Sequence, residues 1–240
     1  MITPYKDNKS GKKEQVAQMF NNIARRYDFL NHFLSLGIDK VWRRKAIGYL
    51  QDINQNPRIL DVATGTGDLA IAALKLNPEK VVGIDISQEM LNIGINKIKK
   101  KNLEHIIELK KGDSENLEFD SDSFDGLTVA FGVRNFENLN KGLSEMHRVI
   151  KPGGKVAVLE FSKPKVFPVK QIYNFYFSAV LPAIGKVISK DQSAYTYLPE
   201  SVSKFPERES FIAELEKVGF RNCIFKPLSF GIATLYVAEK

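Results

Sequence analysis

The stretch 58–87 constrains the fold of this chain more than any other part of its sequence. An apolar run at its start ends in a tight turn that contains Gly65 and Gly67, and a helical pattern follows the turn. A second apolar run then ends on Asp85. Glycine lets the backbone turn sharply and approach a ligand, because it has no Cβ atom. Strand, glycine turn, helix and strand with a terminal carboxylate are typical of the nucleotide-binding half of a doubly wound sheet.

The carboxylates around the turn indicate which nucleotide this half-sheet binds. The turn also satisfies the dinucleotide fingerprint, so a nicotinamide cofactor is one interpretation, and a purely structural role for the glycines is another. A pyrophosphate would lie at the start of the helix, but Asp61 and Asp68 place negative charges there and would repel it. S-adenosylmethionine carries an adenosine and a cationic, phosphate-free tail. The sequence therefore favours a methyl-donor site in which Asp85 accepts hydrogen bonds from the ribose hydroxyls.

The composition predicts one soluble domain in a reducing compartment. The 240 residues suffice for a sizeable core, and contents of 43% hydrophobic and 26% charged residues are ordinary for a globular chain. The single cysteine, Cys223, excludes a disulfide framework. The N-terminal residues lack the apolar core of a signal peptide, and no uncharged run is long enough to span a bilayer. We therefore expect a cytoplasmic protein.

The chain is basic, with a formal net charge of +7 and a pI near 9.3. This excess predicts either a negatively charged partner surface, such as nucleic acid or anionic lipid, or only a solubilising surface. The lysine-rich run 97–101 is predicted to be a solvated helix end. His32, His105 and His147 show no metal-ligand spacing with one another or with Cys223, so no metal site is expected.

Apolar runs and helical patterns alternate along the chain, which predicts an α/β fold with a doubly wound, mostly parallel sheet. Residues 1–13 are polar and basic and are predicted to be frayed. Residues 162–206 break the alternation with aromatics and prolines, and they are interpreted as a helical lid or as a structural connection. The predicted strands are 59–62, 81–84, 106–109, 124–131, 155–161, 221–226 and 232–238. The predicted parts of the single domain are a helical cap (1–55), a cofactor-binding core (56–161), the insertion (162–206) and a closing helix with two strands (207–240).

Several segments together resemble the ubiquinone/menaquinone biosynthesis C-methyltransferases, which implies the seven-stranded class I methyltransferase fold. The resemblance covers nearly the whole chain from about residue 13. Leu30 stands where the family usually has methionine, and Asp39 stands where it usually has histidine. The matching segments are RVIKPGGKVAVLEFS at 148–162, FGVRN at 131–135, YLPESV at 197–202, and the N-terminal signature from Tyr27 to Arg43.

The resemblance also implies positions for the ligands. Thr66 would offer its N–H and hydroxyl to the methionine carboxylate, and Asp113, where the family usually has asparagine, would accept from the adenine amino group. The predicted cofactor contacts are Thr66, Asp85, Asp113 and Ser114, together with Asp61, Gly65 and Gly67 of the turn. The predicted substrate contacts are Tyr27, Asn31, Asn135 and Tyr197.

The implied reaction is methylation of a ring carbon of a polyprenylated quinol, most simply demethylmenaquinol giving menaquinol. The benzoquinol step of ubiquinone biosynthesis is the alternative within the family. The ring carbon becomes nucleophilic when the neighbouring hydroxyl loses its proton. Arg134 follows the fourth strand and is predicted to be the catalytic residue that stabilises the resulting oxyanion; it is not the base, because arginine keeps its proton. A structural salt bridge from Arg134 to Asp28 or Glu160 is the alternative.

Two other classes of function are weighed against this one. An RNA or DNA methyltransferase would explain the basic charge, but it usually has an Asn/Asp-Pro-Pro-aromatic motif after the fourth strand or a catalytic cysteine. A non-catalytic S-adenosylmethionine-binding protein would share the cofactor residues without methylating a quinol extract. We expect no nucleic-acid partner and peripheral contact with the inner face of the cytoplasmic membrane. A homodimer is compatible with the sequence.

Overall fold

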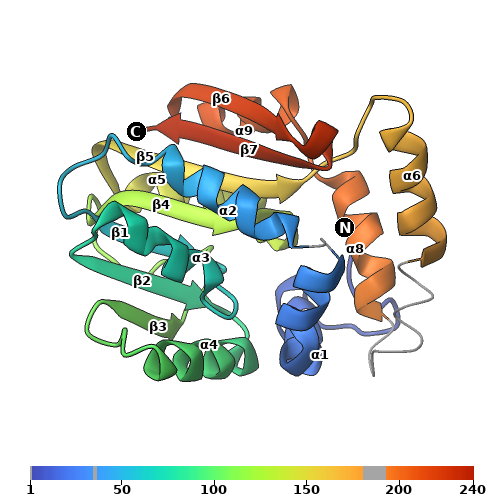
Figure 1. The fold of residues 1–240 in the computed structure, drawn as a ribbon, viewed down its shortest axis with the longest axis horizontal. Helices are drawn as coiled ribbons and strands as arrows, with labels where there is room; N and C mark the ends of the chain where they lie inside the picture. Colours follow the sequence, from blue (N-terminus) through green and yellow to red (C-terminus); the bar gives the residue numbers. More distant parts are fainter. Residues whose placement is uncertain (1, 35–36, 181–192) are drawn as a thin grey trace.

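The computed structural model describes residues 2–34, 37–180 and 193–240, and a seven-stranded sheet forms its centre (Figure 1). The strand order is β3-β2-β1-β4-β5-β7-β6. The first five strands pair in parallel, while β7 runs antiparallel to both β5 and β6. The strands are β1 (Arg58–Val62), β2 (Lys80–Asp85), β3 (Ile107–Lys111), β4 (Phe124–Ala130), β5 (Ile150–Phe161), β6 (Arg221–Leu228) and β7 (Ala233–Glu239). The predicted α/β class and mostly parallel sheet are confirmed.

Helices cover both faces of the sheet. Successive residues of β1 point to opposite faces, as strand geometry requires: Ile59 belongs to the same buried cluster as Leu91 of α4, and Leu60 to the same cluster as Leu143 of α5. The α-helices are α1 (Lys12–Leu34), α2 (Ile38–Gly48), α3 (Asp68–Ala72), α4 (Gln88–Lys100), α5 (Leu139–Val149), α6 (Val169–Phe175), α8 (Ser193–Lys204) and α9 (Glu209–Lys217). Shorter helical turns are η1 (Ala73–Leu76), η2 (Val133–Asn135), η3 (Tyr176–Val180) and η4 (Ser229–Gly231).

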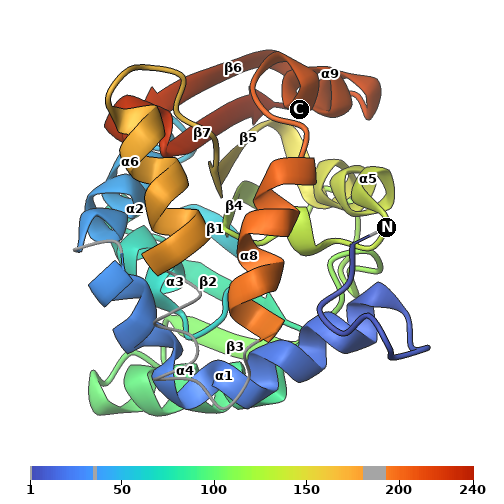
Figure 2. The ribbon, with the colours of Figure 1, turned by 90° about the vertical axis from the view of Figure 1, so that its right-hand side faces the viewer.

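The parallel strands end at one edge of the sheet, and three helices lie across that edge. Figure 2 shows α1, α6 and α8 in front of the strand ends. The strand order reverses between β1 and β4, and sheets of this kind bind ligands outside their carboxyl ends at such a switch point. The fold therefore places a ligand site between this edge and the covering helices.

Most strand bounds differ from the predicted ones by two residues or fewer, and one differs by more. β5 begins at Ile150 rather than at residue 155, because its pairing with β4 shifts in register and accommodates the Lys-Pro-Gly-Gly turn inside the strand. The segment 197–202, which resembles a loop of the family, lies within α8, and α8 contains Pro199. The earlier start of β5 does not move the edge at which the parallel strands end.

The N-terminal segment is not frayed, contrary to the prediction for residues 1–13. The Tyr5 N–H donates to Gln15 Oε1 at 2.9 Å. Ile2 and Tyr5 pack against a small buried cluster formed by Val16 and neighbouring side chains. The beginning of the chain is therefore fixed against the first half of α1.

Candidate active site

Asp85 holds the glycine turn against the end of β2. Its Oδ2 accepts from the Gly65 N–H at 2.8 Å, and its Oδ1 accepts from the Ser87 N–H at 2.8 Å. Burial raises the pKa of Asp85 to about 6, and the backbone donors oppose this rise. Each carboxylate oxygen has a second lone pair, so Asp85 retains the capacity to accept from two ribose hydroxyls.

The cavity beside the turn, which we call the main cavity because most of the predicted cofactor contacts line it, occupies about 640 Å³, counting the open solvent at its mouth. It is lined by four of the predicted cofactor contacts, namely Gly65, Asp85, Asp113 and Ser114. Apolar side chains form much of the remaining wall, including Val16, Phe20, Ile84, Met90 and Phe131. Polar acceptors beside an apolar wall suit the ribose and the flat base of an adenosine.

A smaller acidic cavity continues around the turn. It occupies about 340 Å³, again counting open solvent, and shares Gly65 and other lining residues with the main cavity. Asp61, Thr66 and Asp68 line it, together with Arg43 of α2. Two adjoining cavities, one with a ribose acceptor and one with acids, fit an adenosine joined to a cationic tail. This is the layout of S-adenosylmethionine.

The acid at the end of β1 is completely buried. Asp61 accepts from the hydroxyls of Thr64, at 2.5 Å, and Thr128, at 2.7 Å, and burial raises its pKa to about 6. Gly67 lines neither cavity; it adopts a φ of +80°, and a Cβ there would lie 3.2 Å from Leu109. Gly67 therefore fits the turn and its packing, and its contact with the cofactor stays a prediction.

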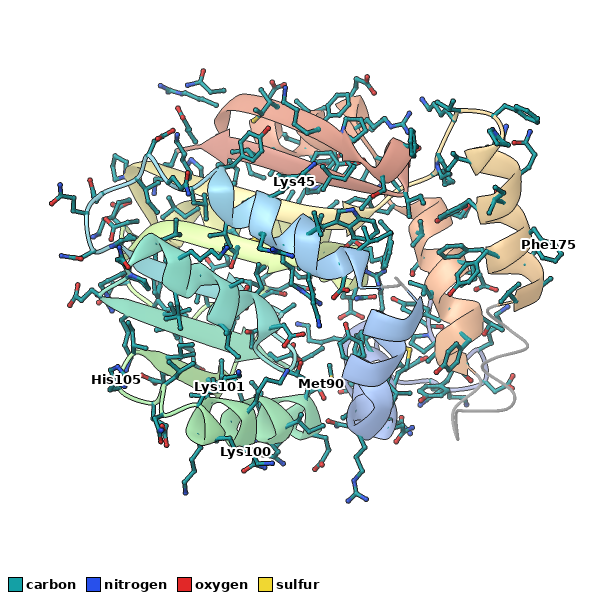
Figure 3. The ribbon with its side chains drawn as sticks, in the orientation of Figure 1. Lys45, Met90, Lys100, Lys101, His105 and Phe175 are labelled. Atoms are coloured by element: carbon teal, nitrogen blue, oxygen red, sulfur yellow. The ribbon has the colours of Figure 1, made fainter. Side chains whose placement is uncertain are left out.

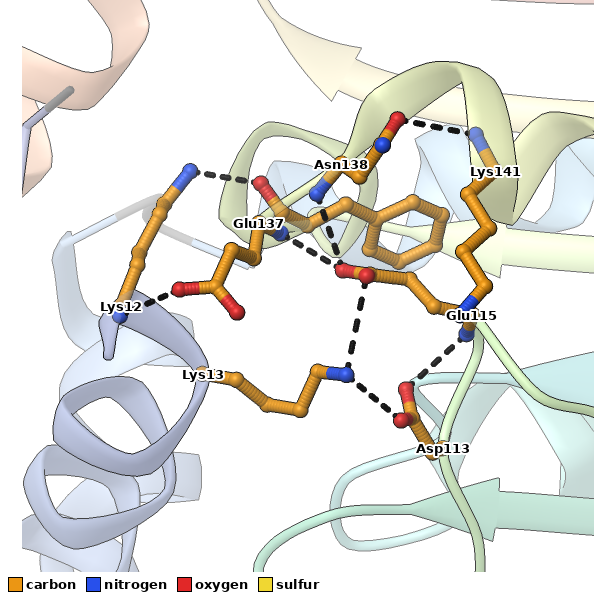
Figure 4. A network of polar contacts seen from close by, with 8 residues as sticks. Lys12, Lys13, Asp113, Glu115, Glu137, Asn138 and Lys141 are labelled. Carbon is orange, nitrogen blue, oxygen red and sulfur yellow. Dashed lines mark hydrogen bonds and ion pairs between the residues drawn. The ribbon is translucent and has the colours of Figure 1, made fainter. Parts of the chain in front are cut away.

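Lys13 of helix α1 reaches Asp113, and both residues line the main cavity (Figure 4). The Lys13 ammonium lies 2.6 Å from Asp113 Oδ2 and 3.5 Å from Glu115 Oε2. Asp113 Oδ1 accepts from the Glu115 N–H at 2.9 Å. Both oxygens of Asp113 are thus engaged, so its predicted bond to adenine would share or replace the contact with Lys13.

Lys12 connects α1 to the turn after β4. Its ammonium donates to the carbonyl oxygens of Phe136, at 2.7 Å, and Arg134, at 3.0 Å. Burial lowers the pKa of Lys12 to about 8, with the Arg134 charge as the second cause. Lys12 and Lys13 were not predicted from the sequence, because they were assigned to a frayed end. Their position just before a helical pattern was the signal that could have placed them at the start of α1.

Arg134 forms the salt bridge to Glu160 that was the alternative interpretation. Its Nη1 lies 2.7 Å from Glu160 Oε1 and donates to the carbonyl oxygen of Phe131 at 2.5 Å. Glu160 is fully buried, which raises its pKa against the lowering effect of Arg134. The salt bridge to Glu160 does not use the Arg134 Nε–H, so it does not decide whether Arg134 also acts on a substrate.

The predicted substrate contacts occupy different parts of the edge. Tyr27 lines both the main and the acidic cavity, and Asn135 lines the main cavity. Tyr197, which is 2% exposed, lines a separate cavity together with Arg134; this α8 cavity occupies about 820 Å³ with its open solvent. Asn31 lies on α1, but its side chain is outside the described residues. The same is true of Asp28, the other predicted salt-bridge partner.

Lys97 differs from the predicted solvated helix end. Its ammonium lies 2.6 Å from Asp68 Oδ1 and 3.1 Å from the Thr66 hydroxyl. Lys97 therefore neutralises part of the negative charge of Asp68 without lining the acidic cavity. No group of three or more potential metal ligands occurs in the described part of the chain.

Comparison with known proteins agrees with this geometry. The model of the ubiE/COQ5 methyltransferase family matches residues 8–240. A demethylmenaquinone methyltransferase of Bacteroides fragilis is 51% identical over 240 residues, covering 100% of this chain and 97% of the relative. The ubiquinone/menaquinone biosynthesis C-methyltransferase UbiE of Geotalea daltonii is 47% identical over 231 residues, covering 95% of this chain and 97% of the relative.

A solved structure supports the fold. The S-adenosylmethionine-dependent methyltransferase from Thermotoga maritima, described as a possible histamine N-methyltransferase, superposes with a TM-score of 0.64 at 17% identity, covering 93% of this chain and 99% of that one. The family match spans nearly the whole sequence and the relatives are nearly full length. The chain therefore belongs to the ubiE/COQ5 methyltransferase family, and its cofactor is S-adenosylmethionine.

Proposed function

We propose that this methyltransferase acts on a ring carbon of a polyprenylated quinol, with demethylmenaquinol as substrate and menaquinol as product. The observation that carries the proposal is a group of buried polar atoms around η2. Arg134 Nε, Asn135 Oδ1 and the Tyr197 hydroxyl have no hydrogen-bond partner among the residues that the structure describes. Buried polar atoms are normally paired, so a ligand with matching oxygens would be stabilised there. A quinol ring carries two such oxygens.

Arg134 Nε and the Tyr197 hydroxyl each have a role in the proposed reaction. Bound S-adenosylmethionine supplies an electrophilic methyl group. The ring carbon becomes nucleophilic when the neighbouring hydroxyl loses its proton to water, and the Arg134 Nε–H stabilises the oxyanion that results. The carbon takes the methyl group, S-adenosylhomocysteine leaves, and loss of the ring carbon's own proton to water restores the aromatic ring. The ion pair with Glu160 fixes the guanidinium through a different nitrogen, Nη1. Burial raises the pKa of Tyr197 to about 12, so Tyr197 keeps its proton and can donate.

Aromatic side chains beside Arg134 support a flat substrate. The rings of Phe131 and Phe161 stack with centroids 4.4 Å apart, and the Arg134 guanidinium lies 5.6 Å from the Phe161 centroid. Trp42 packs edge-on against Phe161, with centroids 6.4 Å apart. Apolar ring faces next to hydrogen-bond donors suit a quinol better than a polar nucleic acid base with a charged backbone.

The naphthoquinol is favoured over the benzoquinol because the Bacteroides fragilis relative carries the demethylmenaquinone name at 51% identity. The test is an assay of the purified chain with labelled S-adenosylmethionine and both demethylated quinols. Label should enter the demethylmenaquinol ring. Transfer to the benzoquinol alone would assign the ubiquinone step, and transfer to neither would overturn the proposal.

The proposed substrate is lipid-soluble, and one surface suits contact with an anionic membrane. No helix in the described residues is long and apolar enough to cross a bilayer. The α6 surface, which we define as Val166, Phe167, Ile172 and Phe175 with Lys165 and Lys170, exposes its side chains around α6. Figure 3 shows Phe175 pointing away from the sheet. Exposed aromatics flanked by lysines suit an interface with anionic headgroups. Cytoplasmic location and a homodimer remain predictions.

A further inference from the structure

Helix α2 carries a buried ion pair that the proposed reaction does not use. Asp39 and Arg43 lie one turn apart, and Arg43 Nη1 is paired with Asp39 Oδ2. The side chains are only 4% and 10% exposed. A buried ion pair adds little net stability, because the cost of desolvating both charges offsets their attraction.

The guanidinium of Arg43 belongs to the acidic cavity. Arg43 Nη1 lies 3.6 Å from Asp68 Oδ2, and its charge also acts on the buried Asp61. Arg43 is the cationic residue among the described side chains that line this cavity. Lys97 reaches Asp68 and Thr66 but does not line the cavity.

The charges of this region complement the end of the cofactor. Among the described side chains of this region, Asp39, Asp61 and Asp68 carry three negative charges and Arg43 and Lys97 carry two positive ones, which leaves one net negative charge for this described set. The tail of S-adenosylmethionine carries a sulfonium, an ammonium and a carboxylate, which leaves one net positive charge. The acids suit the two cations, but a carboxylate among them needs a cationic partner.

We propose that Arg43 binds the α-carboxylate of the cofactor's methionine tail and that Asp39 positions the guanidinium for this contact. Both observed ion pairs of Arg43 involve Nη1, and a guanidinium carries further N–H donors on Nη2 and Nε in a rigid plane that matches a carboxylate. Asp39 holds Arg43 on the cavity side of α2. The Thr66 backbone and hydroxyl then contribute to the same carboxylate instead of binding it alone.

The test compares two ligands that differ only in the tail. S-adenosylhomocysteine carries the amino-acid end, whereas 5′-methylthioadenosine lacks it. Arg43→Ala should weaken S-adenosylhomocysteine binding by about 10- to 100-fold, the usual cost of a charge-assisted hydrogen bond. Its affinity for 5′-methylthioadenosine should change by less than about twofold. Isothermal titration calorimetry measures both, and an equal loss for the two ligands, or no loss for either, overturns the proposal.

Asp39→Asn tests the positioning role. It keeps the size of the side chain and removes the charge that holds Arg43, so S-adenosylhomocysteine should bind about 3- to 10-fold more weakly while 5′-methylthioadenosine is unaffected. Unchanged or tighter binding of S-adenosylhomocysteine would show that Asp39 does not position Arg43.

Two further variants keep the test decisive. Lys45→Ala removes an exposed positive charge from the same helix (Figure 3) and should leave both affinities unchanged. If Arg43→Ala does not fold, Arg43→Lys takes its place, because it retains the charge but loses the planar donor pair. A loss confined to S-adenosylhomocysteine supports the proposal, and an equal change for both ligands overturns it.

Discussion

At the scale of single residues, Asp85 is the side chain on which cofactor affinity should depend most. It accepts from the Gly65 and Ser87 N–H groups and has lone pairs left for two ribose hydroxyls. Asp85→Ala removes these acceptors, and each charge-assisted bond is worth about 1.5–3 kcal/mol. Calorimetric titration with S-adenosylmethionine should show binding weakened by at least the free energy of one such bond. Circular dichroism checks that the variant folds, and wild-type affinity in a folded variant would contradict the assignment.

The same carboxylate predicts how binding depends on pH. Burial raises the pKa of Asp85 from 3.8 to about 6 in the folded protein. The folded state therefore holds this proton more tightly than the unfolded state, so this group's contribution to stability falls as the pH rises through that window. Cofactor affinity should change in the opposite direction and increase between about pH 5 and 7.5, because the ribose needs the ionised carboxylate. In Asp85→Asn, cofactor affinity should depend less steeply on pH. An equally steep dependence would show that another group causes it.

Arg134 requires a variant that separates catalysis from folding. Arg134→Ala leaves Glu160 buried without its partner, and breaking a buried pair costs about 3–5 kcal/mol. Arg134→Lys preserves a positive charge, so its thermal stability should stay closer to wild type. Its kcat should still fall by about 10²–10³, the typical loss for one preorganised donor, with cofactor affinity unchanged.

A double variant controls this experiment. Arg134→Gln with Glu160→Gln replaces the ion pair by two neutral amides, which can bond to each other, so no charge is left buried alone. It should fold, bind the cofactor and transfer no measurable methyl group. Near-normal kcat in either variant would leave Arg134 with a structural role only.

At the scale of whole elements, α1 acts as a cover whose end is fixed by ion pairs. Val16, Phe20 and Tyr27 of this helix line the main cavity, and Lys13 joins it to Asp113 and Glu115. Lys13→Ala should therefore increase amide hydrogen exchange along the first half of α1 while leaving the central strands protected. The matched control is Lys6→Ala, which removes the exposed pair with Glu200. Equal exchange in both variants would show that the Lys13 pairs do not hold the helix.

The elements also show which parts of the structure the sequence could predict. The glycine turn, the strands beside it and the position of Asp85 were predictable, because their signals are local: an apolar run, two closely spaced glycines and a carboxylate at a strand end. The Lys13–Asp113 pair was not, because it joins residues 100 positions apart. The same holds for the pairing of Arg134 with Glu160, which the sequence offered only as one of two structural partners.

At the scale of the whole molecule, the formal net charge of +7 and the α6 surface together predict binding to anionic bilayers. Phe167 and Phe175 are 76% and 65% exposed, and both would enter the interface. The protein should float with vesicles that contain phosphatidylglycerol at low salt. Binding should weaken as salt rises, because exposed charges are screened over about 10 Å at 0.1 M. Vesicles of phosphatidylcholine alone should bind it less.

The α6 surface itself is tested by removing its aromatic side chains. Phe167→Ser with Phe175→Ser should reduce flotation severalfold, because each aromatic side chain loses the apolar area that it would bury in the interface. Ile95→Ser on α4 is the matched control, since Ile95 is also exposed, at 42%, but lies outside the α6 surface. The double variant should methylate a short-chain quinol at the normal rate and lose rate only on tailed substrate presented in vesicles. Equal flotation of the double variant and the control would show that α6 does not face the membrane, and the charge would then serve solubility alone.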